Sequence, residues 1–243
     1  MRYAAKCVVA IAALLPLAAS TAGGDDLAQL KSKLGDFRDI TFVAEVVQKD
    51  KKVLDRMDKR LSLSYEFSKA QVWFKMPYNT RIDGTLGVVK ARLITTDKLS
   101  ILRIPSLRYT KKEDISGEPA KRQSALDVGI LTPQMFSDYE VKLLPEDQRR
   151  PGLIVLDLLR PEKGASIRRL WIDPAKLRLV RMEKRRPDGR LVGAYVYLDY
   201  ERFLDKISVP RRVELYSKDD KLAAAVKLRD IQVDTNLADS LFE

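Results

Sequence analysis

The side chains that most often carry enzymatic or metal chemistry are scarce in this sequence. It contains no histidine, and its single cysteine is Cys7, so Ser-His-Asp sites, Cys-His sites and every histidine-containing metal site are excluded. Three acidic groupings remain as candidates, namely Glu113-Asp114 in a charged loop, Asp219-Asp220 in a turn, and Asp138 with Glu140. None has a partner at ligand spacing or a base beside a nucleophile. We therefore expect no enzyme, no metal and no cofactor.

A different chemistry, the burial of an apolar ligand, fits two groups of bulky apolar side chains. One face of a predicted sheet would carry Leu61, Leu63, Tyr65, Phe67, Val72, Phe74 and Met76, and helices covering that face would carry Leu126, Ile130, Met135 and Phe136. If the two groups enclose a hollow, its wall is apolar throughout, and an acyl chain of about 16 carbons would gain about 10 kcal/mol on burial at about 0.8 kcal/mol per methylene, before ordering costs. The same residues are equally consistent with a solid core.

The N-terminus has the composition of a secretory signal peptide. Arg2 and Lys6 precede an apolar run over residues 7–19, and small residues follow at 20–23. The run is too short to span a bilayer. We expect a signal peptide over residues 1–22, cleaved near Ala22 with Ala19 as the alternative site, and one exported domain over residues 23–243. A cytosolic protein with an apolar N-terminal helix is the other interpretation.

The chain is basic, with 45 Lys and Arg against 34 Asp and Glu and a formal net charge of +11. Such a balance favours anionic partners. The densest basic set, which comprises Arg168, Arg169, Arg178, Arg181, Lys184, Arg185 and Arg186, is scattered along predicted strands. We interpret it as a solvated convex face whose long stems cover apolar surface. Nucleic acid is not expected, because aromatic residues are not interleaved with the basic ones in a binding motif.

The elements that would position these residues are mainly antiparallel strands joined by short turns. In the C-terminal half they are expected over Ile167–Ile172, Leu177–Met182, Leu191–Tyr200, a strand opened by Pro210, and Leu222–Val233, with turns at 173–176, 186–189 and 219–220. In the N-terminal half a helix is expected over Asp26–Phe37, with strands over Ile40–Gln48, Lys59–Phe67, Val88–Thr96, Leu99–Ile104 and Leu107–Lys111 and a charged bend at 49–52. Between the halves a polar loop over 113–122 precedes the capping-box spacing of Ser124 and Asp127 and two short helices broken near residues 129–133.

Four segments of the C-terminal half resemble the LolA-like group of periplasmic outer-membrane lipoprotein-sorting proteins. They are W-I-D-P-A-K-L-R-L-V-R-M-E from Trp171, D-G-R-L-V-G-A-Y-V-Y-L-D-Y from Asp188, V-P-R-R-V-E-L-Y from Val209 and K-L-R-D-I-Q-V-D-T-N-L-A-D-S-L-F from Lys227. The resemblance implies an α+β fold that is mainly β, a half-open antiparallel β-barrel with helices covering its concave face. It also implies an apolar cavity for acyl chains and a movable lid formed by the mid-chain helices.

One position departs from the pattern of this family. The run Val72–Pro77 resembles its strand-plus-proline segment, in which an inward arginine before the proline holds the lid shut. Met76 stands at that position here. Arg81 is the alternative, although nothing in the sequence orients it.

The function expected from the resemblance is a periplasmic carrier of acyl chains. Its cargo would be an acylated lipoprotein or a phospholipid. We expect a monomer that contacts the membrane peripherally and hands cargo to or from an inner-membrane transporter. A lipid sensor of envelope stress and an accessory subunit of an envelope exporter are the alternatives.

Overall fold

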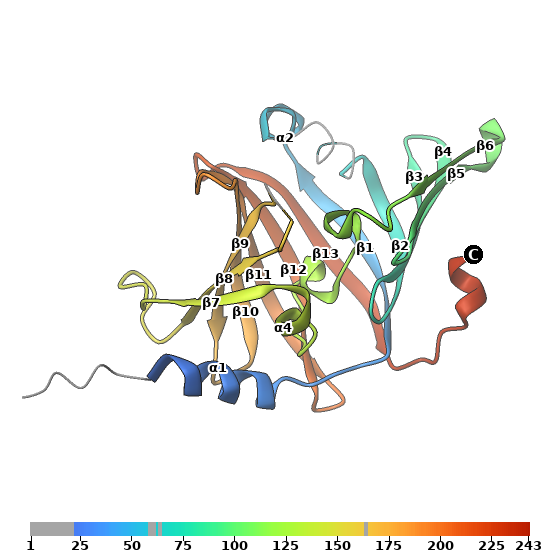
Figure 1. The fold of residues 1–243 in the computed structure, drawn as a ribbon. Coiled ribbons are helices and arrows are strands. Elements are labelled where there is room, and N and C mark those ends of the chain that lie inside the picture. Colours follow the sequence, from blue (N-terminus) through green and yellow to red (C-terminus); the bar gives the residue numbers. More distant parts are fainter. Residues whose placement is uncertain (1–21, 58–61, 63–64, 163–164) are drawn as a thin grey trace, which may run out of the picture.

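The computed structural model describes residues 22–57, 62, 65–162 and 165–243 (Figure 1). Residues 1–21 of the expected signal peptide lie outside the described residues, as do Leu61 and Leu63 of the expected cavity wall.

Thirteen antiparallel strands form one continuous sheet. In chain order they are β1 (Asp39–Lys49), β2 (Phe67–Lys75), β3 (Asn79–Leu86), β4 (Val89–Thr95), β5 (Leu99–Ile104), β6 (Tyr109–Asp114), β7 (Glu140–Leu144), β8 (Ile154–Leu159), β9 (Ile167–Asp173), β10 (Arg178–Arg185), β11 (Leu191–Phe203), β12 (Ile207–Ser217) and β13 (Leu222–Val233). Their order in the sheet is β6-β5-β4-β3-β2-β1-β13-β12-β11-β10-β9-β8-β7.

This order leaves the sheet open. The first strand pairs with the last at the centre, where Ile40 lies opposite Val233, and β6 and β7 are the two edges. The sheet curves into a trough rather than a closed barrel (Figure 1). The expected fold class, a half-open antiparallel β-barrel with helices, is therefore confirmed.

The chain crosses from one edge of the sheet to the other through residues 115–139, hereafter the crossover segment. It contains the short helices η2 (Pro119–Lys121), η3 (Ala125–Val128) and α4 (Met135–Asp138) and lies over the concave face (Figure 1). Helix α1 (Ala22–Lys33) runs along one end of the trough, and α2 (Lys51–Met57) lies at the other end. The last turn, η4 (Asp239–Phe242), packs against β4 and β5 through Phe242.

The concave face is filled by two adjoining apolar clusters. In one, β8, β9 and β10 meet α1 and the crossover segment through residues such as Leu156, Leu170 and Leu131. In the other, β1, β2, β12 and β13 meet Ala125 and Ile130. The even-numbered residues of β9 therefore point inward, as Leu170 and Ile172 show.

Several predicted elements agree with the structure. The strands expected over Ile40–Gln48, Leu99–Ile104 and Leu222–Val233 correspond to β1, β5 and β13. The capping box is present, since the Asp127 carboxylate accepts a hydrogen bond of 2.8 Å from the backbone N–H of Ser124 and one of 3.1 Å from its hydroxyl. Both mid-chain helices are as short as predicted.

Others were wrong. Ser62 is helical, Tyr65 and Glu66 form a turn, and β2 starts only at Phe67, so the described residues before Phe67 do not form the strand expected over Lys59–Phe67. Pro210 lies inside β12 opposite Tyr200 rather than at the start of a strand. The charged bend at residues 49–52 leads directly into α2, which Leu54 anchors by burial against Leu215. Helix α1 also begins and ends several residues earlier than the apolar period predicts.

Candidate functional site

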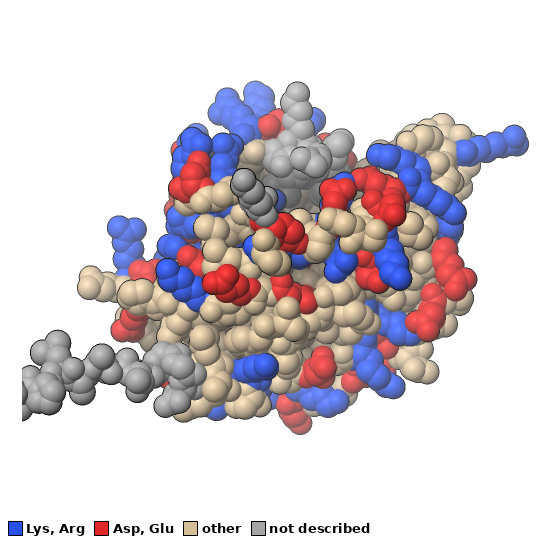
Figure 2. Space-filling view, in the orientation of Figure 1, with Lys and Arg blue, Asp and Glu red and all other residues tan. Residues whose placement is uncertain are grey.

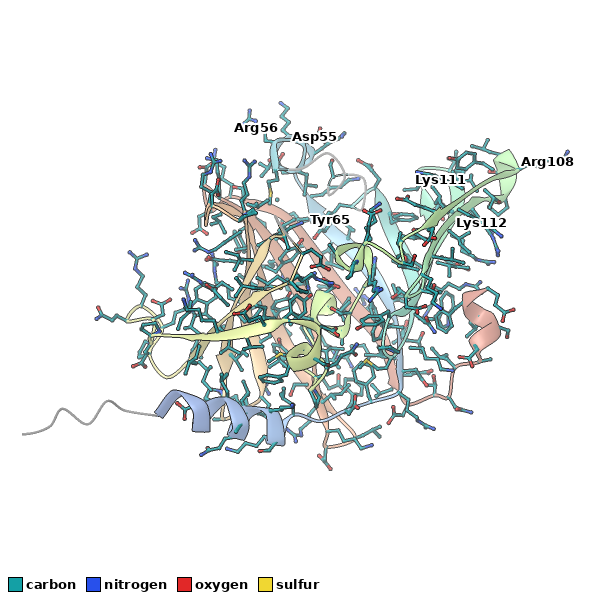
Figure 3. All side chains as sticks on the ribbon, in the orientation of Figure 1. Asp55, Arg56, Tyr65, Arg108, Lys111 and Lys112 are labelled. Atoms are coloured by element: carbon teal, nitrogen blue, oxygen red, sulfur yellow. The ribbon has the colours of Figure 1, made fainter. Side chains whose placement is uncertain are left out.

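A cavity of about 460 Å³ lies between the sheet and the start of the crossover segment. Its wall on the sheet side is formed by Ala44, Val46, Tyr65, Phe67, Ala70, Val72, Ile82, Leu93, Tyr195 and Val226, which come from β1 to β4, β11 and β13 and from the turn before β2. Figure 3 places Tyr65 below α2, between the two halves of the sheet. The volume falls within the roughly 300–1,000 Å³ common for ligand pockets.

Small residues on neighbouring strands explain why the trough is hollow here. Ala44 on β1 lies directly opposite Ala70 on β2, and Ala70 lies opposite Gly84 on β3. Residues directly opposite in an antiparallel sheet point to the same side, so three strands present almost no side-chain volume at this level. Phe67 occupies the space above Gly84, where a Cβ would come within 2.5 Å of its ring.

The roof of the cavity is polar, in contrast to its wall. Ala120, Lys121, Arg122, Gln123 and Asp127 of the crossover segment close it. Lys121 is held in ion pairs by Glu113 and, at 2.9 Å, by Glu118. The cavity is therefore amphipathic, with an apolar wall on the sheet side and a charged roof, rather than apolar throughout as the sequence suggested.

Arg168 on β9 is the inward-facing charge that meets this roof. Its guanidinium Nη1 lies 2.9 Å from Oδ1 of Asp127, and only 17 % of the Arg168 side chain is exposed. Burial alone would lower the pKa of Arg168, but the Asp127 carboxylate together with nearby tyrosine side chains outweighs it and raises that pKa. The guanidinium also lies 5.6 Å from the ring centroid of Tyr139, where the crossover segment ends. Arg168 thus ties the sheet to η3 and to the residue that follows α4.

Further polar contacts hold the crossover segment at its two flanks. The hydroxyl of Tyr78, just after β2, donates a hydrogen bond of 2.6 Å to Asp138, and burial together with this bond raises the pKa of Tyr78. Arg122 donates to the carbonyl of Asp97 at 3.0 Å and lies 5.4 Å from the Tyr78 ring centroid. These contacts are partly exposed, so each stabilises the closed arrangement only modestly.

The expected cavity residues divide between a hollow part and a packed part of the trough. Tyr65, Phe67 and Val72 line the cavity. Phe74, Met76 and Ile130 pack together in the adjoining core. Leu126, Met135 and Phe136 belong to the cluster over β8 to β10, where Phe136 also lies under the ammonium of Lys31 at 5.7 Å.

Of the arginines considered from the sequence, the structure places only Arg168 at the roof. Arg81 instead pairs with Asp83 at 2.7 Å and lies 5.0 Å from the ring centroid of Trp73, beside η4. The interpretation of Arg168 as a convex-face residue was wrong, because it shares the inner face with Leu170. Its position in the alternating pattern 168, 170, 172, with two apolar residues after it, is the signal that could have revealed this.

Neither metal chemistry nor membrane insertion by a helix is supported among the described residues. No group of three or more His, Cys, Asp or Glu side chains is arranged to hold a metal ion. Within residues 22–57, 62, 65–162 and 165–243, no helix combines the length and apolar character needed to cross a bilayer.

Comparisons with known proteins bear on the fold. No family model and no curated protein sequence matches the chain. Among solved structures, a putative outer membrane lipoprotein-sorting protein domain from Vibrio parahaemolyticus is similar at a TM-score of 0.56 and 13 % identity, covering 90 % of this chain and 95 % of its own. A LolA superfamily protein from Nitrosomonas europaea gives a TM-score of 0.60 and 15 % identity, with coverages of 90 % and 96 %. A DUF1329 family protein from Desulfovibrio piger gives a TM-score of 0.53 and 13 % identity, with coverages of 90 % and 95 %. The similarity spans nearly the full length of each structure, and the chain therefore has a LolA-like fold.

Proposed function

We propose that the protein is an exported carrier that binds acyl chains in the cavity beneath the crossover segment. Residues 1–22 would direct export to the periplasm and be cleaved near Ala22, and residues 23–243 would form the binding domain. The carrier acts without catalysis, as a monomer in peripheral contact with the membrane, and exchanges cargo with an inner-membrane transporter. Its cargo is the acyl chain of a lipoprotein or a phospholipid.

The observation that carries this proposal is the apolar hollow at the level of Ala44 and Ala70. The hollow of about 460 Å³ is walled on the sheet side by aliphatic and aromatic side chains. A concave, mainly apolar wall of this size suits the burial of an apolar ligand. The lipoprotein-sorting name of one structural relative supports an acylated ligand.

The distribution of apolar anchors indicates how the cavity would open. Leu126, Ile130 and Met135 are each at most 3 % exposed and fix the second half of the crossover segment to the core. Residues 120–123, which line the roof of the hollow, and residues 116–119 before them contain no buried apolar side chain. Opening therefore needs only the loss of polar contacts, and burial of an acyl chain at about 0.8 kcal/mol per methylene would offset that loss.

The test is extraction of the purified protein with organic solvent, followed by mass spectrometry of the extract. We expect stoichiometric fatty-acyl lipid or acylated peptide from the wild type. The variant Ala44→Phe, whose ring would occupy the hollow, should lose it. Ala28→Phe on the exposed face of α1 makes the same chemical change outside the cavity and should retain it.

The two kinds of cargo separate in the same extract. Phospholipid indicates a lipid carrier, whereas acylated peptide indicates lipoprotein sorting. An extract without lipid from wild-type protein, together with failure to bind added fatty acid, would contradict the proposal.

A further inference from the structure

A second cavity, hereafter the mouth pocket, lies at the end of the trough covered by α2. Its volume is about 470 Å³. Three segments build it, namely α2, the turn between β10 and β11, and the turn between β12 and β13. The lining residues are Val53, Arg56, Met57, Arg186, Arg190, Leu191, Val192, Ser217, Lys218, Asp219 and Lys221. Figure 3 shows Arg56 at the top of the molecule on α2, and Figure 2 shows Lys and Arg side chains gathered over this end.

The mouth pocket carries a strong excess of positive charge. Five of its lining side chains are Arg or Lys, against one carboxylate, Asp219. Lys218 pairs with Asp219 at 2.7 Å, and Arg190 pairs with Asp188, beside the pocket, at 2.6 Å. In the part of the chain that the structure describes, no ion pair joins Arg56, Arg186 or Lys221 to a carboxylate. Three cations from three different segments thus line one cavity, and none of them forms an ion pair with a described carboxylate.

The charge environment of Asp219 supports this convergence. A hydrogen bond from Lys218 lowers the pKa of Asp219, and Lys221 and Arg56 lower it further through their charge. Arg56 belongs to α2 and Lys221 to the start of β13, so the two elements act on the same site. Because Asp219 is already paired with Lys218, it leaves the other cations available to an external anion.

The mouth pocket and the acyl cavity both adjoin β11. Leu191 lines the pocket and Tyr195 lines the cavity, and a shift of register lies between them, since Leu191 is opposite Arg185 whereas Gly193 is opposite Lys184. Gly193 lies between them, with Cε of Met57 only 2.4 Å from the position a Cβ would take. Met57, which packs with Leu54, Leu215 and Tyr195, therefore lies between the basic pocket and the hollow. Its flexible side chain is the group that would have to move for one amphiphile to occupy both.

We infer that the mouth pocket binds the phosphate group of the amphiphile whose acyl chain occupies the cavity. The planar, bidentate donors of Arg56 and Arg186 suit phosphate oxygens, and Lys221 adds a point charge. Val53, Met57 and Leu191 give the pocket an apolar side that suits the glycerol and first methylenes of a phospholipid. The assignment of this phosphate to the carried lipid rests on the proposed function, whereas the phosphate site itself stands on the mouth pocket alone.

The test compares binding of three probes by calorimetry: a short-chain phosphatidylglycerol, an uncharged monoacylglycerol with the same chain, and glycerol phosphate without a chain. The variant Arg186→Ser/Lys221→Ser removes two unpaired cations of the mouth pocket. The matched control, Lys111→Ser/Lys112→Ser, removes two exposed cations from the β5–β6 hairpin, away from α2 (Figure 3). All four positions are on the surface, so both variants should fold.

We expect the pocket variant to bind phosphatidylglycerol about tenfold more weakly, with unchanged affinity for monoacylglycerol, while the control retains both affinities. Added salt should weaken only phosphatidylglycerol binding. An equal loss in the two variants, or no loss in either, would overturn the inference. Glycerol phosphate binding as tight as that of the phospholipid would overturn its assignment to the carried lipid. If monoacylglycerol fails to bind while glycerol phosphate binds and is lost in the pocket variant, the acyl carrier is refuted but the phosphate site stands.

Discussion

Replacing Arg168 with methionine should loosen the crossover segment without unfolding the sheet. Methionine keeps much of the side-chain length and is compatible with an apolar surrounding. The substitution removes the ion pair of 2.9 Å to Asp127 and leaves this carboxylate without its cation. Asp127 retains its hydrogen bonds from Ser124, so helix η3 should survive.

The size of the effect follows from the exposure of the two partners. Removing one member of a fully buried pair costs about 3–5 kcal/mol, but Asp127 is 32 % exposed, so water can solvate it after the substitution. We expect the closed segment to lose about 1–2 kcal/mol, and each 1.4 kcal/mol corresponds to about tenfold in the opening equilibrium.

Hydrogen exchange measured by mass spectrometry would detect this change. Peptides from residues 116–128 should exchange about tenfold faster in Arg168→Met, whereas peptides from β1 and β13 should keep their protection. Arg169→Met is the matched control, because Arg169 lies on the opposite face of β9 and pairs with Asp157 at 2.8 Å. Unchanged exchange over residues 116–128 would refute the role assigned to Arg168, as would an equal acceleration in Arg169→Met.

Three further outcomes follow from the fold. Gly129→Ala should destabilise the protein by about 2–4 kcal/mol in urea unfolding, because Gly129 has φ +86° and a Cβ would lie 2.3 Å from the Tyr197 ring. The control is Gly189→Ala, at φ +83° with open space around it, which should cost only about 1–2 kcal/mol. Equal losses in the two variants would contradict the packing argument. Burial alone would raise the pKa of Asp39, but hydrogen bonds from residues 235–237 outweigh it and lower that pKa. The stability that Asp39 contributes is therefore present above about pH 4 and is lost as pH falls through the lowered pKa. Asp39→Asn should make the free energy of unfolding less dependent on pH in this acid range, and an unchanged dependence would exclude Asp39 as its source. Phe242→Ala should lower the free energy of unfolding by about 3 kcal/mol, since Phe242 is 5 % exposed against Ile94 and Ile101, and a loss within error would show that η4 does not contribute to the core.

Sequence reasoning located several strands well. The predicted bounds of β1 and β13 agree with the structure to within one residue. β3 went undetected because its outer face carries Arg81 and Asp83, whose ion pair replaces the usual apolar or neutral alternation. β7 and β8 were likewise not assigned.

The cavity was harder to predict because it arises where small side chains leave space unfilled. Ala44 and Ala70 were not candidates, since small residues carry no apolar signal of their own, yet their direct pairing opens the hollow. Arg168 was assigned to the wrong face because its charge was weighed above its place in the strand alternation. Helix α2 escaped prediction because it is only 7 residues long and has a single buried residue, Leu54.

The pairing of β1 with β13 at the centre of the sheet has a consequence for folding. Because β1 pairs with β13, the two halves of the trough cannot be joined until the chain has been made through β13. Folds dominated by such distant contacts have high contact order and form slowly. For the exported carrier that we propose, this delay would extend the time during which the polypeptide remains competent for translocation.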